Sequence, residues 1–195
     1  MRGDDVLMSI QTRRLVGRLL VASPALVDAN FRRAVVLVLD HGDDGALGLL
    51  VNRPMDVEVS SVLPAWQPHT TAPGRLFQGG PVQLDSALGL VAVPGTGAQP
   101  IGVRLLIGSV GLVDLDAPPE VVAPGLAGLR IFAGYAGWSA GQLEAEIGQG
   151  AWYVVDSEPR DAFSDRPERL WPDVLRRQRG RLAMISTFPD DPNMN

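Results

Sequence analysis

One stretch of the chain has the residue types of a hydrolase nucleophile: residues 134–144, Gly-Tyr-Ala-Gly-Trp-Ser-Ala-Gly-Gln-Leu-Glu. Its Gly-x-Ser-x-Gly pattern places Ser139 between an apolar run, Leu129 to Ala133, and a helix-compatible run, Gln142 to Ile147. A hydrolase nucleophile stands on such a strand–turn–helix corner, the nucleophile elbow. Ser139 is therefore a candidate nucleophile.

A serine nucleophile needs a general base, and the chain offers two histidines, His41 and His69, both upstream of Ser139. In α/β-hydrolases the histidine follows the serine, so that topology is excluded. Triads recur in other chain orders, and a different fold could bring His41 to Ser139. A serine hydrolase built on Ser139 and His41 is kept as an alternative. The favoured interpretation of His41 is a solvated turn residue, because adjacent strand residues such as Asp40 and His41 point to opposite faces.

The same motif has a structural interpretation, which we favour. Ser139 and Gln142 have the Ser-x-x-Gln spacing of a capping box, which predicts a helix beginning at Ser139. Trp138 and Leu143 then occupy the positions of a hydrophobic staple. A third interpretation is binding without chemistry, since free N–H groups at Ala140 and Gly141 could hold a carboxylate or phosphate.

A second candidate site is Asn52-Arg53-Pro54, which follows an apolar run. Arg53 could clamp an anion with its two-pronged guanidinium. In the alternative interpretation, Asn52 closes a turn and Arg53 pairs with a nearby acid. Because loops converge at strand ends, we expect this turn and the serine corner to form one concave surface. The predicted ligand-binding residues are Asn52, Arg53, Gly79, Gly80, Tyr135, Trp138, Ser139, Gly141 and Gln142.

Composition excludes much familiar catalytic machinery. All 17 basic residues are arginine, which removes Schiff-base and P-loop lysines, and the absence of cysteine removes thiol nucleophiles and thiolate zinc sites. With two histidines, a metal site is not expected, and no cofactor is expected. Glu144 and Glu146 stand two apart on the expected helix and do not face one another. Tyr135, Trp138, Trp152 and Trp171 are expected to be core or interface aromatics.

Charge and apolar content limit the partners. A net charge of −5 disfavours a nucleic-acid surface, and the one basic cluster, Arg176 to Arg181, is interpreted as complementing a helix C-terminus. The N-terminus lacks the features of a signal peptide, and no apolar run reaches the roughly 20 residues needed to cross a bilayer. We therefore expect a cytoplasmic protein that does not enter the membrane, with a small anion or a protein as partner.

The elements that would position these residues follow from hydrophobic patterning. Two apolar runs, 34–39 and 46–51, flank Gly42-Asp43-Asp44-Gly45, which predicts a hairpin covered on both faces. Residues 129–133, the helix to about 147 and residues 151–155 predict a strand–helix–strand unit with a parallel crossover. An antiparallel hairpin in the first half of the chain and a parallel crossover in the second half together indicate a mixed sheet with helices packed on it. This arrangement belongs to the α+β class.

Further elements are expected on either side of these. Strands are predicted at 19–22, 76–78, 87–93 and 103–107, and a helix at 57–66 that Pro64 ends early. Pro172 is placed in the first turn of the last helix. Residues 94–100 and 116–125 are too rich in Pro and Gly for core elements. The chain is expected to be one domain, 1–195, with flexible ends at 1–14 and 187–195.

Several ordered blocks resemble the YqgE/AlgH family over nearly the full chain. Besides the serine motif, these blocks are residues 19–24 (Leu-Leu-Val-Ala-Ser-Pro), 31–36 (Phe-Arg-Arg-Ala-Val-Val), 45–54 (Gly-Ala-Leu-Gly-Leu-Leu-Val-Asn-Arg-Pro), 79–82 (Gly-Gly-Pro-Val) and the ending 191–195. The resemblance implies a partly barrel-like mixed sheet surrounded by helices, and no established reaction.

Residues and resemblance together predict a non-catalytic ligand-binding or regulatory interaction module, with a small anion site. The serine hydrolase is one alternative. A transcriptional regulator, the label that some relatives carry, is the second, although no helix-turn-helix pattern is found in the sequence.

Overall fold

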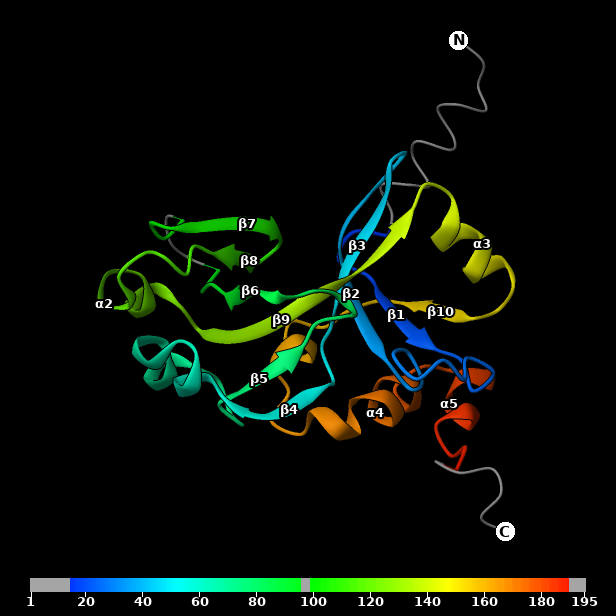
Figure 1. The fold of residues 1–195 in the computed structure, drawn as a ribbon. Helices are drawn as coiled ribbons and strands as arrows, with labels where there is room; N and C mark the ends of the chain where they lie inside the picture. Colours follow the sequence, from blue (N-terminus) through cyan, green and yellow to red (C-terminus); the bar gives the residue numbers. More distant parts are fainter. Residues whose placement is uncertain (1–14, 96–98, 190–195) are drawn as a thin grey trace.

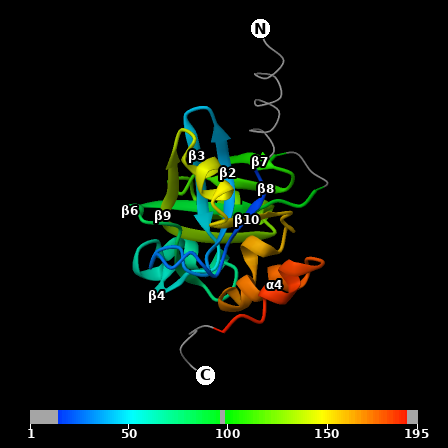
Figure 2. The ribbon, with the colours of Figure 1, turned by 90° about the vertical axis from the view of Figure 1, so that its right-hand side faces the viewer.

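The computed structural model describes residues 15–95 and 99–189, and within them ten strands form one curled sheet (Figures 1 and 2). The strand order is β10-β1-β2-β3-β9-β6-β8-β7, while β5 pairs with β4 and β9. The strands are β1 (Leu19–Ala22), β2 (Val35–Gly42), β3 (Gly45–Leu50), β4 (Pro54–Glu58), β5 (Arg75–Gln78), β6 (Val82–Ala92), β7 (Val103–Ile107), β8 (Val110–Val113), β9 (Gly128–Ser139) and β10 (Trp152–Val155). Strands and helices together confirm the α+β class with a mixed, partly barrel-like sheet. The family's expected ending, 191–195, and the expected flexible ends, apart from 187–189, lie outside the described residues.

The predicted hairpin is confirmed as β2 and β3. His41 pairs with Ala46 and Gly42 with Gly45, so the turn is the Gly-Asp-Asp-Gly stretch. Both faces are covered, as the continuous apolar pattern requires: Leu37 packs in one buried cluster and Val36 in another.

Strand β9 is longer than predicted. The expectation that the strand ends near Ala133 and turns within the glycine motif is wrong, because pairing continues to Ser139 beside Gly45 of β3. Glycine here serves close packing: Gly134 adopts φ +68° inside the strand, and a Cβ on it would lie 2.6 Å from the Val82 carbonyl oxygen. The motif is thus the second half of a strand rather than an elbow.

The strand–helix–strand unit is confirmed. After β9 the chain turns at Gly141 (φ +73°), forms α3 (Gln142–Gly148) and returns as β10, which pairs with β1 at the sheet edge. Four antiparallel steps separate β9 from β10 across β3, β2 and β1, so the two strands run in the same direction. The connection is therefore a parallel crossover.

The remaining helices are short, and several were not predicted. They are α2 (Pro119–Val122), α4 (Leu170–Arg176), α5 (Arg181–Ile185) and the 3-10 helices η1 (Val59–Ser61), η2 (Pro64–His69), η3 (Ala123–Gly125), η4 (Asp161–Phe163) and η5 (Pro167–Arg169). Pro172 lies in the first turn of α4, as predicted. The predicted helix at 57–66 is replaced by β4, η1 and η2, and the expectation that 116–125 holds no core element is wrong, since α2 buries Val122.

Helix α4 closes one side of the core. Its apolar face packs in the same buried cluster as residues of β1 and β2, and the Trp171 indole N–H donates to the Ala22 carbonyl over 2.8 Å. Figure 1 shows α4 and α5 next to each other beside the end of β1. The segment between β10 and α4 is thereby held against the sheet.

Candidate ligand-binding site

The two residues of the hydrolase alternative do not meet. His41 pairs with Ala46 of β3, which in turn pairs with Trp138 of β9, so these three side chains lie on the same face of the sheet. The side chain of Ser139, the next residue along β9, points to the opposite face. His41 is buried, with Nε2 2.8 Å from a Glu144 carboxylate oxygen, and Ser139 Oγ donates to Gln142 Oε1 over 3.2 Å. The geometry thus gives no support to the hydrolase. The expectation of a solvated His41 is also wrong, because α3 folds back over the hairpin end.

The predicted capping box forms only in part. Gln142 Oε1 reaches back to accept the Ser139 backbone N–H over 3.0 Å, as the box requires. The helix, however, begins at Gln142 with Gly141 as its N-cap, and no side chain caps the helix. Ser139 as N-cap is therefore wrong. With Gly141 as N-cap, Trp138 and Leu143 do not occupy the staple positions either, although the two side chains share one buried cluster. Ligand contact by the exposed Ser139, Gly141 and Gln142 stays a prediction.

The corner is fastened by one carboxylate. Glu146 Oε2 accepts the indole N–H of Trp138 over 2.9 Å and that of Trp152 over 2.8 Å, and Oε1 accepts the Gln142 amide over 3.0 Å. The two indoles meet edge to face, with ring centroids 6.0 Å apart. Glu146 therefore fixes α3 to both strands, β9 and β10, that the helix connects.

Asn52 has a structural role at the far end of β3. Its Oδ1 accepts the Val35 N–H over 2.8 Å and its Nδ2 donates to the Arg33 carbonyl over 2.9 Å. Arg53 donates to the Arg32 carbonyl rather than to an acid, so the expected ion pair is wrong. Burial, and secondarily the charge of Arg32, lower the pKa of Arg53 below its ordinary value.

Gly79 and Gly80 pass directly against the backbone of β9. A Cβ on Gly79 would lie 2.2 Å from the Gly134 carbonyl oxygen, and one on Gly80 would lie 2.1 Å from the carbonyl carbon of Tyr135. Both glycines are needed for this close approach.

The sequence-predicted residues do not form one concave surface. Ser139 pairs with Gly45, the first residue of β3, whereas Arg53 follows the last residue, Leu50. Six strand residues span about 20 Å at ~3.3 Å each. The serine corner and the Asn-Arg turn therefore lie at opposite ends of the strand.

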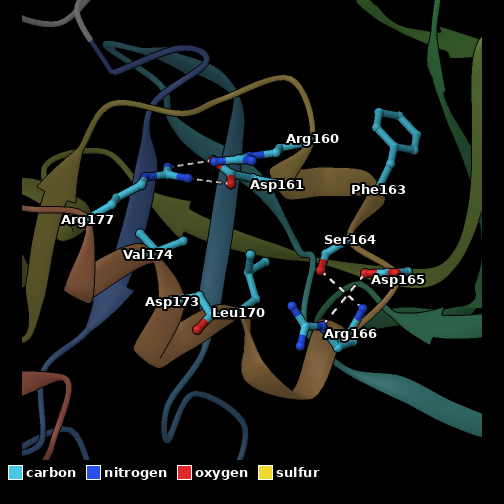
Figure 3. Close-up of a pocket in the computed structure, with 10 residues that line it drawn as sticks. All are labelled: Arg160, Asp161, Phe163, Ser164, Asp165, Arg166, Leu170, Asp173, Val174 and Arg177. Atoms are coloured by element: carbon cyan, nitrogen blue, oxygen red, sulfur yellow. Dashed lines mark hydrogen bonds and ion pairs between the residues drawn. The ribbon is translucent and has the colours of Figure 1, made fainter.

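A different cavity, of about 500 Å³, is lined by α4 and by the segment that connects β10 to α4, and it brings charged side chains together (Figure 3). We call it the arginine pocket. It is lined by Arg160, Asp161, Phe163, Ser164, Asp165, Arg166, Leu170, Asp173, Val174 and Arg177. In Figure 3, Arg177 and Asp161 point toward one another on one side, while Ser164, Asp165 and Arg166 gather on the other. Leu170 and Val174 supply an apolar wall from α4.

A clamp between Arg177 and Asp161 shapes one side of the pocket. The Arg177 terminal nitrogens each lie 2.6 Å from a different oxygen of the buried Asp161 carboxylate, a bidentate pair. Asp161 also accepts the Glu158 N–H over 2.6 Å, which closes the turn before η4. Hydrogen bonding to Asp161 raises the pKa of Arg177 above its ordinary value. The negative charge of Asp161 is therefore already neutralised within the protein.

Beneath the pocket lies a buried arginine from β9. Arg130 is 1% exposed, stacks over the Phe77 ring at 4.2 Å, and donates to the carbonyls of Ala162, Ser164 and Ala72 at 2.7–3.0 Å. Within residues 15–95 and 99–189 no carboxylate forms an ion pair with it. Burial lowers the pKa of Arg130 to about 10, and the charge of Asp165 opposes that shift.

Two arginines at the rim keep free donors. Arg160 pairs with Glu158 through Nε alone, over 2.7 Å, and Arg166 Nε is 4.0 Å from Asp165; their side chains are 80% and 67% exposed. No hydrogen bond from a terminal nitrogen of either is found in the described part of the chain. Both guanidinium groups can therefore donate two parallel hydrogen bonds to an anion.

Sequence reasoning missed this pocket. The stretch 129–133 has an apolar pattern in which Arg130 is the exception, and a lone charge in a buried strand needs polar partners that the fold supplies. Of the basic cluster 176–181, Arg176 pairs with Asp173 and Arg177 with Asp161, so two of its positive charges are paired with carboxylates. Among the described residues no group of three His, Asp or Glu could hold a metal, and no helix is long and apolar enough to cross a membrane.

Comparison with known proteins matches residues 19–183 to the family described as AlgH-like. A UPF0301 protein of Streptomyces coelicolor is 60% identical, covering 93% of this chain and 95% of its own. Among solved structures, a crystal structure from Corynebacterium diphtheriae is similar with a TM-score of 0.83, 35% identity and coverage of 88% of this chain and 91% of its own. The solution structure of AlgH from Pseudomonas aeruginosa aligns with a TM-score of 0.66, 29% identity and coverage of 91% and 95%. The chain belongs to the AlgH-like family.

Proposed function

We propose that this protein is a non-catalytic binding module whose arginine pocket takes a small anion, a carboxylate or a phosphate. The observation that carries the proposal is that Arg160 and Arg166, at the rim of the cavity, keep their terminal guanidinium nitrogens without a partner among the described residues, while the inner carboxylate, Asp161, is already neutralised. A planar guanidinium fits a carboxylate or phosphate through two parallel hydrogen bonds.

The local charge balance favours an anion. Asp161 is neutralised by Arg177, and Asp173 by Arg176, which sets aside two pairs. The remaining charged groups are three cations, Arg130, Arg160 and Arg166, and two carboxylates, Glu158 and Asp165. The buried Arg130 is poorly screened by water, so its charge acts on the pocket more strongly than a surface charge would. An anion in the pocket would offset this excess of one positive charge.

The residues of the pocket favour binding over catalysis. Its single hydroxyl, Ser164, accepts the Arg166 N–H over 3.2 Å, and no histidine lines the cavity to act as a general base near neutral pH. The apolar wall of Phe163, Leu170 and Val174 suits a ligand that carries some carbon besides its charge. Small organic acids and phosphorylated metabolites meet both conditions.

A thermal-shift titration with succinate and inorganic phosphate tests the proposal, with sodium chloride at equal ionic strength as reference. Both anions should raise the melting temperature of the wild type. Arg166→Gln should lose about tenfold in affinity, because a charge-assisted contact worth about 1.4 kcal/mol is removed. Arg104→Gln, which removes an exposed arginine of β7 with no ion pair in the described residues, is the matched control. Equal shifts in all three proteins would refute the pocket as the anion site.

A further inference from the structure

A second cavity, of about 610 Å³, lies beside α5, shares no lining residue with the arginine pocket and has a different character. We call it the α5 cavity. It is formed by Ser23 at the end of β1, Tyr153 of β10, and Arg181, Met184, Ile185 and Phe188 of α5 and the turn that follows it. Figure 1 shows α5 beside the end of β1, which is where these segments meet.

Ser23 carries a hydroxyl that the protein leaves unsatisfied. The residue is 4% exposed, and its Oγ has no hydrogen-bond partner among the described residues. Its backbone is fully used, since the N–H donates to the Ala151 carbonyl and the carbonyl accepts the Leu26 N–H. Buried hydroxyls in folded proteins are nearly always paired, so an orphan in the wall of a cavity points to a partner that enters the cavity.

Two large apolar side chains that line the cavity are exposed to solvent. Met184 is 69% exposed and Phe188 is 49% exposed, although both flank the cavity. Phe188 is held in place, because its carbonyl accepts a hydrogen bond from the Arg33 guanidinium, which itself stacks over Trp171 at 4.3 Å. The apolar surface is thus presented by a fixed backbone rather than by a loose end.

Arg181 supplies a cation at the edge of this apolar surface. It is exposed and forms no ion pair within the described residues. A ligand that satisfies all three features has an apolar body for Met184 and Phe188, a carboxylate for Arg181, and an oxygen within reach of Ser23.

From these features we propose that the α5 cavity binds monocarboxylates with a medium-length apolar chain, separately from the arginine pocket. The chain buries against Met184, Ile185 and Phe188. The carboxylate takes a charge-assisted pair from Arg181, and the Ser23 hydroxyl donates to the other carboxylate oxygen. This site is independent of the proposed function, which concerns small polar anions and other residues.

Calorimetric titration of the full chain with sodium octanoate, 1-octanol and sodium acetate separates the contributions. Octanoate should bind saturably, octanol at least tenfold more weakly because it lacks the charge, and acetate without measurable saturation because it lacks the chain. Failure of octanoate to saturate, or equal affinity for octanol, overturns the proposal.

Variants assign the binding to this cavity. Arg181→Gln should reduce octanoate affinity to the octanol level, while Arg104→Gln should leave it unchanged. Ser23→Ala should weaken octanoate severalfold and leave the melting temperature of the free protein equal or higher, because the hydroxyl has no partner to lose. A hydroxyl with a purely structural role would instead lower that temperature. Unchanged octanoate binding in Arg181→Gln places the ligand elsewhere and overturns the assignment.

Discussion

Removing the Glu146 carboxylate should release the corner between β9, α3 and β10. Glu146→Ala leaves two buried indole N–H groups, those of Trp138 and Trp152, without their acceptor. An unsatisfied buried donor costs about 1–3 kcal/mol, and two give about 2–6 kcal/mol. Because Glu146 is only half-buried, water can enter the space and satisfy part of the loss, so we expect the lower half of that range, about 2–4 kcal/mol.

Urea denaturation followed by far-ultraviolet circular dichroism measures this change. For a chain of this length, the loss corresponds to a fall in melting temperature of about 4–16 °C. Glu146→Gln keeps an oxygen acceptor and should cost about 1 kcal/mol, whereas Glu120→Ala, which truncates an exposed glutamate of α2, should change the free energy of unfolding by less than about 0.5 kcal/mol.

The same substitution in a Trp152→Phe variant tests the part that each indole plays. Trp152→Phe removes one indole donor and keeps an aromatic ring, so Glu146→Ala should cost about half as much in that background as in the wild type. If Glu146→Ala is no more destabilising than Glu120→Ala, or costs the same in both backgrounds, the carboxylate does not hold the corner through the indoles.

Three other substitutions test the remaining interpretations. Asn52→Ala should cost about 2–3 kcal/mol in urea denaturation, because two hydrogen bonds to buried backbone are lost; a loss below about 0.5 kcal/mol would contradict its structural role. Gly80→Ala should fail to give a folded protein by circular dichroism, since its Cβ would meet β9 backbone, whereas Gly148→Ala, with open space around it, should fold normally; equal behaviour of the two would contradict the packing. Burial lowers the pKa of Arg130 to about 10, so above that pH the unfolded chain binds more protons than the folded one. The free energy of unfolding of the wild type relative to Arg130→Met should therefore rise by about 1 kcal/mol between pH 9 and 11, and a flat or falling difference in paired denaturation curves would refute the shift.

The elements that were predictable are those with local signals. The β2–β3 hairpin follows from two continuous apolar runs around a Gly/Asp turn, and the first turn of α4 follows from the position of Pro172. The predicted turn within the glycine motif is wrong because Gly134 allows another chain segment to pass close to β9 and does not form a turn. Such a contact joins residues more than 50 positions apart and leaves no trace in local periodicity.

The arginine pocket could not be predicted from the sequence, because it too depends on contacts between residues far apart in the chain. The arginine pocket depends on Arg177 reaching Asp161, 16 positions away, and on Arg130 reaching carbonyls 32 to 58 positions away. Neither spacing corresponds to a helix or strand period. The one available signal was the charge of Arg130 inside a buried strand, which could have directed attention to the segments around it.

Strand β9 has a mechanical consequence for the whole protein. Its C-terminal residues pair with β3 and its N-terminal residues with β6, so both halves of the sheet share this one segment. The two halves cannot separate from each other without breaking a ladder on β9. In native-state hydrogen exchange, amides near Leu129 and near Trp138 should therefore open with the same free energy, equal to that of global unfolding. A chain cut inside β9 and rejoined at its natural ends should lose the cooperativity of both halves at once.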